Sequence, residues 1–189
     1  MTNEVRSEPP LCVDLDGTLI EGDTLRISLR YLARTSPWKL LAVPFLLLRG
    51  RPALKAWVAG QHIPNPSELI WRTEVLQFLR EERGRGRQIV LATAAHKLVA
   101  DAVCAHLGLF DSIVATEIGA NVKGEQKTAH IRKSLSCNDF DYIGDSEADI
   151  PIFQVARVSY LVAPSPSLSA AAKSVGRIAR EFHTDQKAK

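Results

Sequence analysis

The sequence predicts an α/β protein in which a parallel β-sheet is covered by helices on both faces. Short apolar runs rich in Val and Ile recur along the chain, and longer stretches with helical spacing lie between them. Strands that alternate with helices in this way are typical of a parallel sheet. Such sheets bind ligands beyond the carboxyl ends of their strands, so polar residues at those positions are the first candidates for a site.

Five apolar runs are predicted to be strands, since each has strand length and is bounded by turn residues. They cover residues 11–15, 88–93, 112–116, 141–145 and 158–163. Four helices are predicted from apolar spacing and from capping and stop residues. They cover residues 65–84, 95–108, 123–135 and 167–182. The first should be capped by Ser67, the second should end at Gly108, and the last is weakened by Gly176 in its interior.

Length and composition indicate an ordinary globular domain. The chain has 189 residues, of which 46% are hydrophobic and 24% charged, which suffices for a sizeable core. The net charge of +3 is too small to indicate a nucleic-acid partner. The three cysteines have no metal-ligand spacing and indicate reduced thiols in a cytoplasmic protein. The polar N-terminus does not have the pattern of a secretion signal.

Polar residues follow three of the predicted strands. Asp14 and Asp16 stand at the end of the first strand, Thr93 at the end of the second and Asp145 at the end of a later one. One aspartate at such a place is usually a turn residue or a helix cap. Four polar residues of these types together predict a shared crevice at the carboxyl edge of the sheet.

The spacing of Asp14 and Asp16 suits phosphate chemistry. Residues two apart on an extended segment point the same way, so both carboxylates can approach one atom. Close carboxylates repel each other, which favours a proton on one or a cation between them. Mg²⁺ suits an oxygen-rich site of this kind if Asp145 joins it. An ionised aspartate can attack phosphorus while its neighbour protonates the leaving oxygen.

Four motifs resemble, in order and spacing, those of the haloacid dehalogenase superfamily, whose commonest members are Mg²⁺-dependent phosphatases. The resemblance covers roughly residues 11–163 and implies a Rossmann-like fold with a small helical cap inserted after the first strand. The motifs are "DLDGT" at 14–18, "ATA" around Thr93, "KGE" at 123–125 and "GDSEAD" at 144–149.

This resemblance implies roles for the acidic residues. Asp14 would be the nucleophile that forms an aspartyl-phosphate, and Asp16 the general acid and then the base. Asp145 would hold Mg²⁺ together with Asp14 and the backbone carbonyl of Asp16. Thr18 and Asp149 would support the site.

The resemblance also implies phosphate ligands, namely Thr93 and a lysine of the third motif. Lys123 is the preferred lysine because it stands at the head of its helix, nearest the strand ends. Lys127 lies one helical turn further and is the alternative, although a solvated lysine is the expected state at that position. The "DLD" pair favours phosphate-ester hydrolysis over dehalogenation, while a phosphomutase would keep the same residues.

The domain organisation follows from the same reading. Residues 1–10 are predicted to be a disordered N-terminus and 184–189 a polar tail. Residues 11–22 and 67–183 would form the core, and 23–66 the helical cap. No acidic residue occurs from position 24 to position 67. The basic residues of that stretch are Arg26, Arg30, Arg34, Lys39, Arg49, Arg51 and Lys55.

The centre of the predicted cap, "PWKLLAVPFLLLRGR", is too short for a membrane span, which needs roughly 20 apolar residues. Its aromatic residues Trp38 and Phe45, with Trp57 nearby, suit a surface that dips into an anionic bilayer. Two alternatives remain open at this point. The leucines of the run can pack against the core, and the basic residues can attract a soluble anion.

The cap and the fourth motif resemble the phosphoserine-phosphatase-like domain that is fused to membrane polyprenyl transferases. This resemblance implies a lipid-linked or prenyl-linked phosphate as substrate, a functional link to such a transferase, and a place on the inner face of the membrane. Gly17 and Asp23 replace a Ser and a Glu that phosphoserine phosphatases use, which argues against an amino-acid phosphate. Asp23 would then face the leaving group. The alternatives are a soluble phosphorylated metabolite and a non-catalytic docking module with the same fold.

Overall fold

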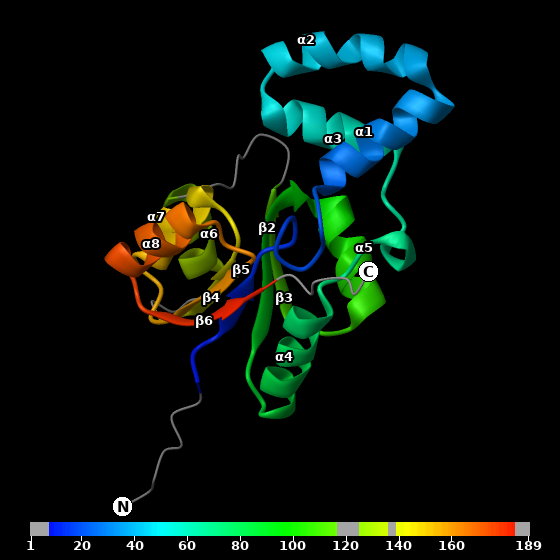
Figure 1. Cartoon of the computed structure of the whole chain (residues 1–189). Coiled ribbons are helices and arrows are strands. Elements are labelled where there is room, and N and C mark those ends of the chain that lie inside the picture. The colour runs from blue at the N-terminus through cyan, green and yellow to red at the C-terminus, as the bar shows by residue number, and fades with distance from the viewer. Residues whose placement is uncertain (1–7, 117–124, 136–138, 184–189) are drawn as a thin grey trace, which may run out of the picture.

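The computed structural model describes residues 8–116, 125–135 and 139–183, and it shows the predicted α/β architecture (Figure 1). Its sheet has six strands in the order β3, β2, β1, β4, β5, β6, and every neighbouring pair is parallel. The strands are β1 (Leu11–Val13), β2 (Ile89–His96), β3 (Ser112–Thr116), β4 (Asp141–Gly144), β5 (Ser159–Val162) and β6 (Ile178–Phe182). The predicted fold class is therefore confirmed.

Helices cover both faces of this sheet, with α4 and α5 on one face and α6, α7 and α8 on the other (Figure 1). Their bounds are α4 (Thr73–Gly84), α5 (Lys97–Leu107), α6 (Glu125–Leu135), α7 (Ile150–Phe153) and α8 (Pro166–Val175). The short 3-10 helix η3 (Glu147–Asp149) precedes α7. Successive side chains of a strand point to opposite faces of the sheet. Leu11 and Val13 face α4 and α5, whereas Cys12 belongs to the core on the opposite face. This double burial explains why β1 is apolar throughout.

The predicted last helix is wrong in its second half. Helix α8 ends at Val175, and residues 178–182 form the edge strand β6. A Cβ on Gly176 would lie 2.2 Å from the carbonyl oxygen of Phe153, so only glycine allows the chain to pass α7 so closely. Beyond this point Ile178 pairs with Ser159 of β5, and the ladder replaces the helix.

The predicted helix 65–84 also begins later than expected. Its first residues form the 3-10 turn η2 (Pro66–Glu68), which is capped by the side chain of Asn65. The next residues are held in extended form, since Trp71 bridges to Ile20 and the backbone N–H of Arg72 donates to the carbonyl of Leu19. Helix α4 can therefore start only at Thr73.

A group of helices between β1 and α4 lies beyond the carboxyl ends of the strands, at the top of Figure 1. We call these elements the cap helices: α1 (Thr24–Thr35), η1 (Pro37–Ala42), α2 (Val43–Leu48) and α3 (Arg51–Gln61). They share a small core of their own around Leu32, Leu54 and Val58. The predicted boundaries 23–66 remain an interpretation, and the predicted terminal segments lie outside the described residues except for positions 8–10. Within the described ranges, no helix has both the length and the apolar character needed to cross a membrane.

Candidate active site

Three strand ends meet at the carboxyl edge of the sheet. Val13 of β1 pairs with Leu91 of β2 and with Ile143 of β4, so these three strands run in register. The residues that follow, Asp14, Thr93 and Asp145, are thereby delivered to the same edge. The backbone N–H of Asp14 continues the ladder by donating to the carbonyl of Ile143 at 3.0 Å.

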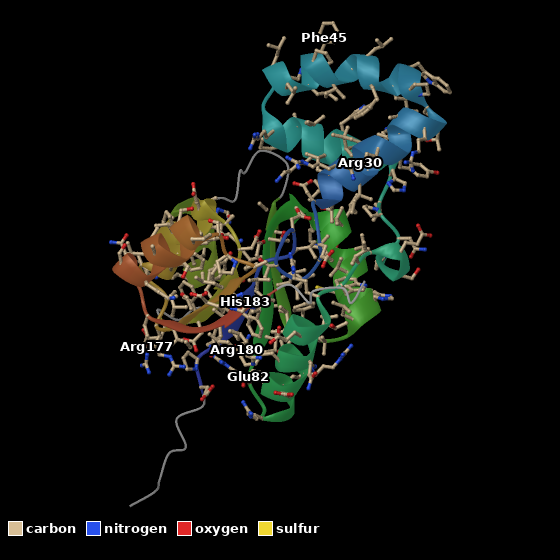
Figure 2. The ribbon with its side chains drawn as sticks, viewed as in Figure 1. Arg30, Phe45, Glu82, Arg177, Arg180 and His183 are labelled. Carbon is tan, nitrogen blue, oxygen red and sulfur yellow. The ribbon has the colours of Figure 1, made fainter. Side chains whose placement is uncertain are left out.

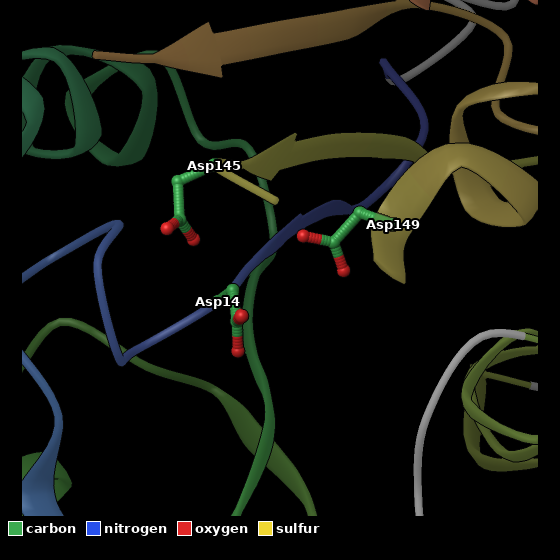
Figure 3. Close-up of side chains that lie close together, drawn as sticks. All are labelled: Asp14, Asp145 and Asp149. Atoms are coloured by element: carbon green, nitrogen blue, oxygen red, sulfur yellow. The ribbon is translucent and has the colours of Figure 1, made fainter. Parts of the chain in front are cut away.

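Three carboxylates converge at this edge, as Figure 3 shows. Asp14, Asp145 and Asp149 each offer an oxygen, and these oxygens all lie within 4.8 Å of one another. Asp149 comes from η3, where it forms a capping box with Ser146. The hydroxyl of Ser146 donates to Oδ2 of Asp149 at 3.0 Å, which fixes this carboxylate toward the other two. We call Asp14, Asp145 and Asp149 the acidic cluster.

Lys127 of α6 is the cation of the site, and the expectation that it is solvated is wrong. Only 3% of its side chain is exposed, and its Nζ lies 3.1 Å from Oδ1 of Asp14 and 3.7 Å from Oδ1 of Asp149. The same Nζ donates to the Tyr142 hydroxyl at 2.6 Å, which in turn donates to Asp149 at 2.9 Å. Lys123 lies outside the described residues.

Burial and mutual repulsion shift the ionisation of the cluster. Burial and then the charge of Asp14 raise the pKa of Asp145 to about 7. Burial also raises the pKa of Asp14, although the charge of Lys127 opposes this. For Lys127 itself, burial would lower the pKa, but the charges of Asp14 and Asp149 outweigh burial and raise it. The lysine is therefore held charged among carboxylates that have too few partners.

The loop after β1 is shaped around Asp145. Thr18 is fully buried, and its hydroxyl donates to Oδ1 of Asp145 at 2.8 Å. Gly17 has a φ of +82°, and a Cβ at this position would lie 2.0 Å from Oδ2 of Asp145. Glycine is thus required both by the backbone conformation and by the close carboxylate. Arg72 holds the loop from outside through its Nε, which donates to the carbonyl of Gly17 at 2.9 Å.

The side chain of Asp16 does not join the acidic cluster but turns to the start of α1. It accepts a hydrogen bond from the backbone N–H of Thr24 at 2.7 Å and another from the Thr24 hydroxyl at 3.3 Å. Burial raises the pKa of Asp16 to about 6, although the bond from Thr24 opposes the shift. The two carboxylates of the "DLD" pair therefore have separate surroundings, one ionic and one next to the cap helices.

Thr93 is fully buried near the end of β2, where its Oγ1 accepts from the backbone N–H of Ala95 at 3.0 Å. Next to it, Lys55 of α3 reaches across from the cap helices and donates to the carbonyl of Ala94. Lys55 also lines a small pocket between cap and core that includes Asp16 and His96. This pocket lies on the Asp16 side of the site, between the cap helices and the core.

Asp23 also lines that pocket, but its carboxylate has a local task. Its Oδ1 accepts from the backbone N–H of Arg26 at 2.9 Å, so Asp23 is the N-cap of α1. An acidic N-cap satisfies a free N–H and favours the positive end of the helix dipole. The predicted contact with a leaving group remains a prediction.

The acidic cluster fits a hard divalent cation. Oδ1 of Asp14 is buried and, within the described part of the chain, accepts no hydrogen bond of proper geometry. Among the described residues, the three carboxylates lie around the ammonium group of Lys127, which leaves negative charge to be balanced. Carboxylate oxygens are the ligands that Mg²⁺ prefers. Asp14, Asp145 and Asp149 can therefore hold such an ion.

Two features of the site were not predicted from the sequence. One is the contact of Tyr142 with Lys127 and Asp149, and the other is the burial of Lys127. The alternation within β4 carried a signal for the first, since Tyr142 must point to the face covered by α6. The burial of Lys127 follows from that contact, because the lysine needs the Tyr142 hydroxyl and the acidic cluster to leave water.

Solved structures share this fold. A Bordetella pertussis Tohama I protein of unknown function is 16% identical, with a TM-score of 0.72 over 91% of this chain and 98% of that one. A predicted phosphatase from Clostridium acetobutylicum is 18% identical, with a TM-score of 0.65 over 95% of each chain. A phosphoserine phosphatase in its apo form is 18% identical, with a TM-score of 0.61 over 93% of this chain and 94% of that one.

Sequence comparison finds a relative and a family. Uncharacterized protein y4nM of Sinorhizobium fredii (strain NBRC 101917 / NGR234) is 38% identical over 153 residues. The match covers 81% of this chain but only 30% of that relative, so the chain spans less than a third of the relative's length. The haloacid dehalogenase-like hydrolase family matches residues 11–154. Because this match covers most of the chain, including the acidic cluster, the protein belongs to the haloacid dehalogenase-like hydrolases.

Proposed function

We propose that this hydrolase is a phosphatase that cleaves a phosphomonoester through an aspartyl-phosphate on Asp14. One observation carries the proposal. Oδ1 of Asp14 is buried 3.1 Å from the Lys127 ammonium and, among the described residues, accepts no hydrogen bond of proper geometry, at the edge where a parallel sheet binds its ligands. A buried carboxylate oxygen next to a cation suits attack on a phosphate group that carries negative charge.

The two aspartates divide the chemistry. In the first step an oxygen of Asp14 bonds to phosphorus, the ester P–O bond breaks, and Asp16 gives its proton to the leaving oxygen. In the second step Asp16 takes a proton from water, the water oxygen bonds to phosphorus, and inorganic phosphate leaves Asp14. A pKa of about 6 allows Asp16 to hold or release a proton near neutral pH. Its bonds from Thr24 keep it on the side where the leaving group would enter.

Phosphate binding falls to Thr93 and Lys127 in this proposal. Lys127 is preferred over Lys123 because its ammonium already lies between Asp14 and Asp149. A buried ammonium with three donors can exchange part of this contact for phosphate oxygens when substrate arrives.

We propose Mg²⁺ as the cofactor, held by Asp14 and Asp145, with Asp149 supporting them or ligating directly. When bound, the ion would neutralise charge on the phosphate oxygens and keep Asp14 ionised. Hydrogen bonds within the chain fix the orientation of two of these carboxylates. Thr18 orients Asp145 and Ser146 orients Asp149.

For the substrate class we propose a lipid-linked or prenyl-linked phosphate. This part is supported by the cap helices, which stand over the pocket next to Asp16, contain no acidic residue and expose apolar side chains. A functional link to a membrane polyprenyl transferase is the narrowest form of the proposal and rests on sequence resemblance.

A phosphate-release assay tests the function. Purified protein is given prenyl, phosphatidyl and sugar phosphates, each with and without Mg²⁺. We expect Mg²⁺-dependent release of phosphate, fastest on a lipid-linked substrate. Turnover of sugar phosphates alone would overturn the substrate class, and absence of turnover on the whole panel would overturn the enzymatic proposal.

The choice of lysine has its own test. Lys127→Met should lower kcat/KM by about 10²- to 10³-fold, because a charge that stabilises the transition state is removed. Lys133→Met, on the exposed side of the same helix, is the matched control and should behave as the wild type. If Lys123→Met is the variant that loses activity while Lys127→Met keeps it, the assignment is reversed.

A further inference from the structure

The outer side of the cap helices carries a group of exposed apolar residues. Trp38 and Leu41 in η1 are 65% and 75% exposed, and Phe45 and Leu48 in α2 are 71% and 87% exposed. We call these four residues the outer cap face. Figure 2 shows Phe45 projecting from α2 away from the sheet. A group of large apolar side chains that are all more than half exposed on one short segment is unusual and often marks a contact site.

The outer cap face is not part of the core that the cap helices share. The alternate residues of the same segment, Leu40, Val43 and Leu46, pack inward on the cap core. The segment is therefore apolar on both sides, whereas a helix on the surface of a domain needs only one apolar side. Packing on the cap core explains why the inward residues of this segment are apolar. It does not explain why the exposed residues are apolar as well.

The charges around this face have one sign. None of the 21 acidic residues lies between positions 24 and 67. Arg34 precedes the outer cap face along the chain, Arg49 and Arg51 follow it, and all three are exposed. An exposed apolar face bordered by arginines is complementary to a surface that is apolar inside and negatively charged outside. A second copy of the chain would instead bring arginine against arginine.

We propose that the outer cap face docks on an anionic lipid bilayer. Trp38, Leu41, Phe45 and Leu48 would enter the boundary between headgroups and acyl chains, where aromatic and aliphatic side chains of amphipathic helices lie. The arginines would contact the anionic headgroups. The contact is interfacial and reversible, because α2 has only six residues and cannot span the membrane. This inference rests on surface apolarity and charge and is independent of the proposed phosphatase activity.

Sedimentation with vesicles tests the docking. The full chain carrying Asp14→Asn, so that no turnover intervenes, is mixed with vesicles of phosphatidylcholine alone or of equal parts phosphatidylcholine and phosphatidylglycerol. We expect binding to the anionic vesicles only, with weakening as salt is raised. Trp38→Ser with Phe45→Ser should weaken binding by more than about tenfold. Arg49→Gln and Arg51→Gln should each weaken it by about fivefold.

Ile70→Ser with Val155→Ser is the matched control, since both side chains are exposed and apolar but lie outside the cap helices. This variant should bind vesicles as the parent does, and circular dichroism melts should show that all variants are folded. The proposal is overturned if anionic vesicles do not bind, or if the Trp38 and Phe45 changes leave binding intact. It is also overturned if these changes instead abolish self-association seen in analytical ultracentrifugation without lipid. Activity on a soluble phosphomonoester, measured separately, shows whether the phosphatase proposal stands on its own.

Discussion

Two groups of charged residues lie at opposite edges of the same sheet, and they differ in how their charges are satisfied. The acidic cluster and Lys127 lie at the carboxyl edge. At the amino edge lies a second group, which we call the arginine cluster and which consists of Glu82, Arg87, Asp141 and Arg157. Figure 2 shows Glu82 at the end of α4 that lies far from the cap helices.

The arginine cluster is balanced. Asp141, at the start of β4, accepts from Arg87, from Arg157 at 2.7 and 3.0 Å, and from the backbone N–H of Val158 at 3.1 Å. Arg87 also donates to Glu82 at 2.7 Å and to the carbonyl of Pro9 at 2.9 Å. These contacts join β1, β2, β4 and α4 at the points where they begin or end. Arg85 and Glu8 add one further ion pair each, to Glu82 and to Arg87, so the positive and negative groups balance and the group requires no further ligand.

The acidic cluster is unbalanced in both charge and hydrogen bonds. Within the described residues, the three carboxylates lie around Lys127, which pairs with Asp14 and Asp149, and Oδ1 of Asp14 accepts no hydrogen bond of proper geometry. A folded protein tolerates such a deficit where a ligand completes the group. The comparison suits a stabilising role for the arginine cluster and the proposed chemistry for the acidic cluster, and substitutions can separate the two.

The largest effect is expected at Asp14. Asp14→Asn removes the proposed nucleophile and should lower kcat by more than about 10⁴-fold. The free energy of unfolding without metal should stay equal or rise, because repulsion within the acidic cluster decreases. Phosphate release and urea unfolding measure the two quantities. A variant that unfolds early would mean that the acidic cluster holds the fold, and the contrast with the arginine cluster would be lost.

Asp141→Asn should have the opposite profile. Removing the Asp141 charge takes a carboxylate partner from both Arg87 and Arg157 within a buried ionic group, and this should lower the free energy of unfolding by about 3–5 kcal/mol. The kcat of the protein that remains folded should be unchanged, since Asp141 is at the far edge of the sheet. Urea unfolding at 15 °C with activity normalised to the folded fraction checks both points. Glu181→Gln, in a surface ion pair with the exposed Lys173, is the control and should cost less than about 1 kcal/mol.

The sequence was sufficient for the parts of the fold that follow from periodicity. Five of the strands and the stop of α5 at Gly108 were predicted because burial on both faces makes strands apolar throughout and because Gly108 adopts the left-handed conformation of a helix cap. The edge strand β6 was missed because its exposed side is polar, as in "IAREF", and resembles the helix before it. Only the close passage of Gly176 against Phe153 decides where that helix ends.

The site could be predicted where its residues follow a strand. Asp14 and Asp145 lie at strand ends, and the parallel register brings them together. Lys127 could not be placed in the same way, since its position on α6 alone predicts exposure and its burial depends on Tyr142 across the gap between helix and sheet. The sequence also did not show that Asp16 lies apart from the acidic cluster, because this depends on its hydrogen bond with the first turn of α1.

Metal and pH should act together on the acidic cluster. The pKa values of Asp145 and Asp16, raised by burial to about 7 and about 6 from 3.8, mean that the folded state holds protons that the unfolded chain has released. The free energy of unfolding without metal should therefore fall as pH rises from about 4 to about 7. Mg²⁺ binds the ionised carboxylates, so its stabilising effect should grow over the same range.

At pH 8 and a Mg²⁺ concentration of about 100 times Kd, the gain in unfolding free energy should be about 2.7 kcal/mol. At pH 5 it should nearly vanish because protons compete for the same oxygens. Thermal melts with and without Mg²⁺ at both pH values measure this, and Asp145→Asn should remove the difference. An equal gain at pH 5 and pH 8 would show that Mg²⁺ binds elsewhere.

The smallest effect is expected at Asp23, an aspartate near the site whose carboxylate already accepts a hydrogen bond from the backbone N–H of Arg26. Asp23→Ala should lower the free energy of unfolding by about 1 kcal/mol, because the N–H of Arg26 loses its acceptor, whereas Asp23→Asn should cost only a few tenths of that. Neither change should alter kcat/KM more than about fivefold, since Asp23 touches no member of the acidic cluster. If Asp23→Asn instead raises KM strongly with its stability intact, the carboxylate contacts the leaving group. Asp23 would then be a residue of the active site and not only the N-cap of α1. The first turn of α1 would in that case contribute to substrate binding as well as to stability.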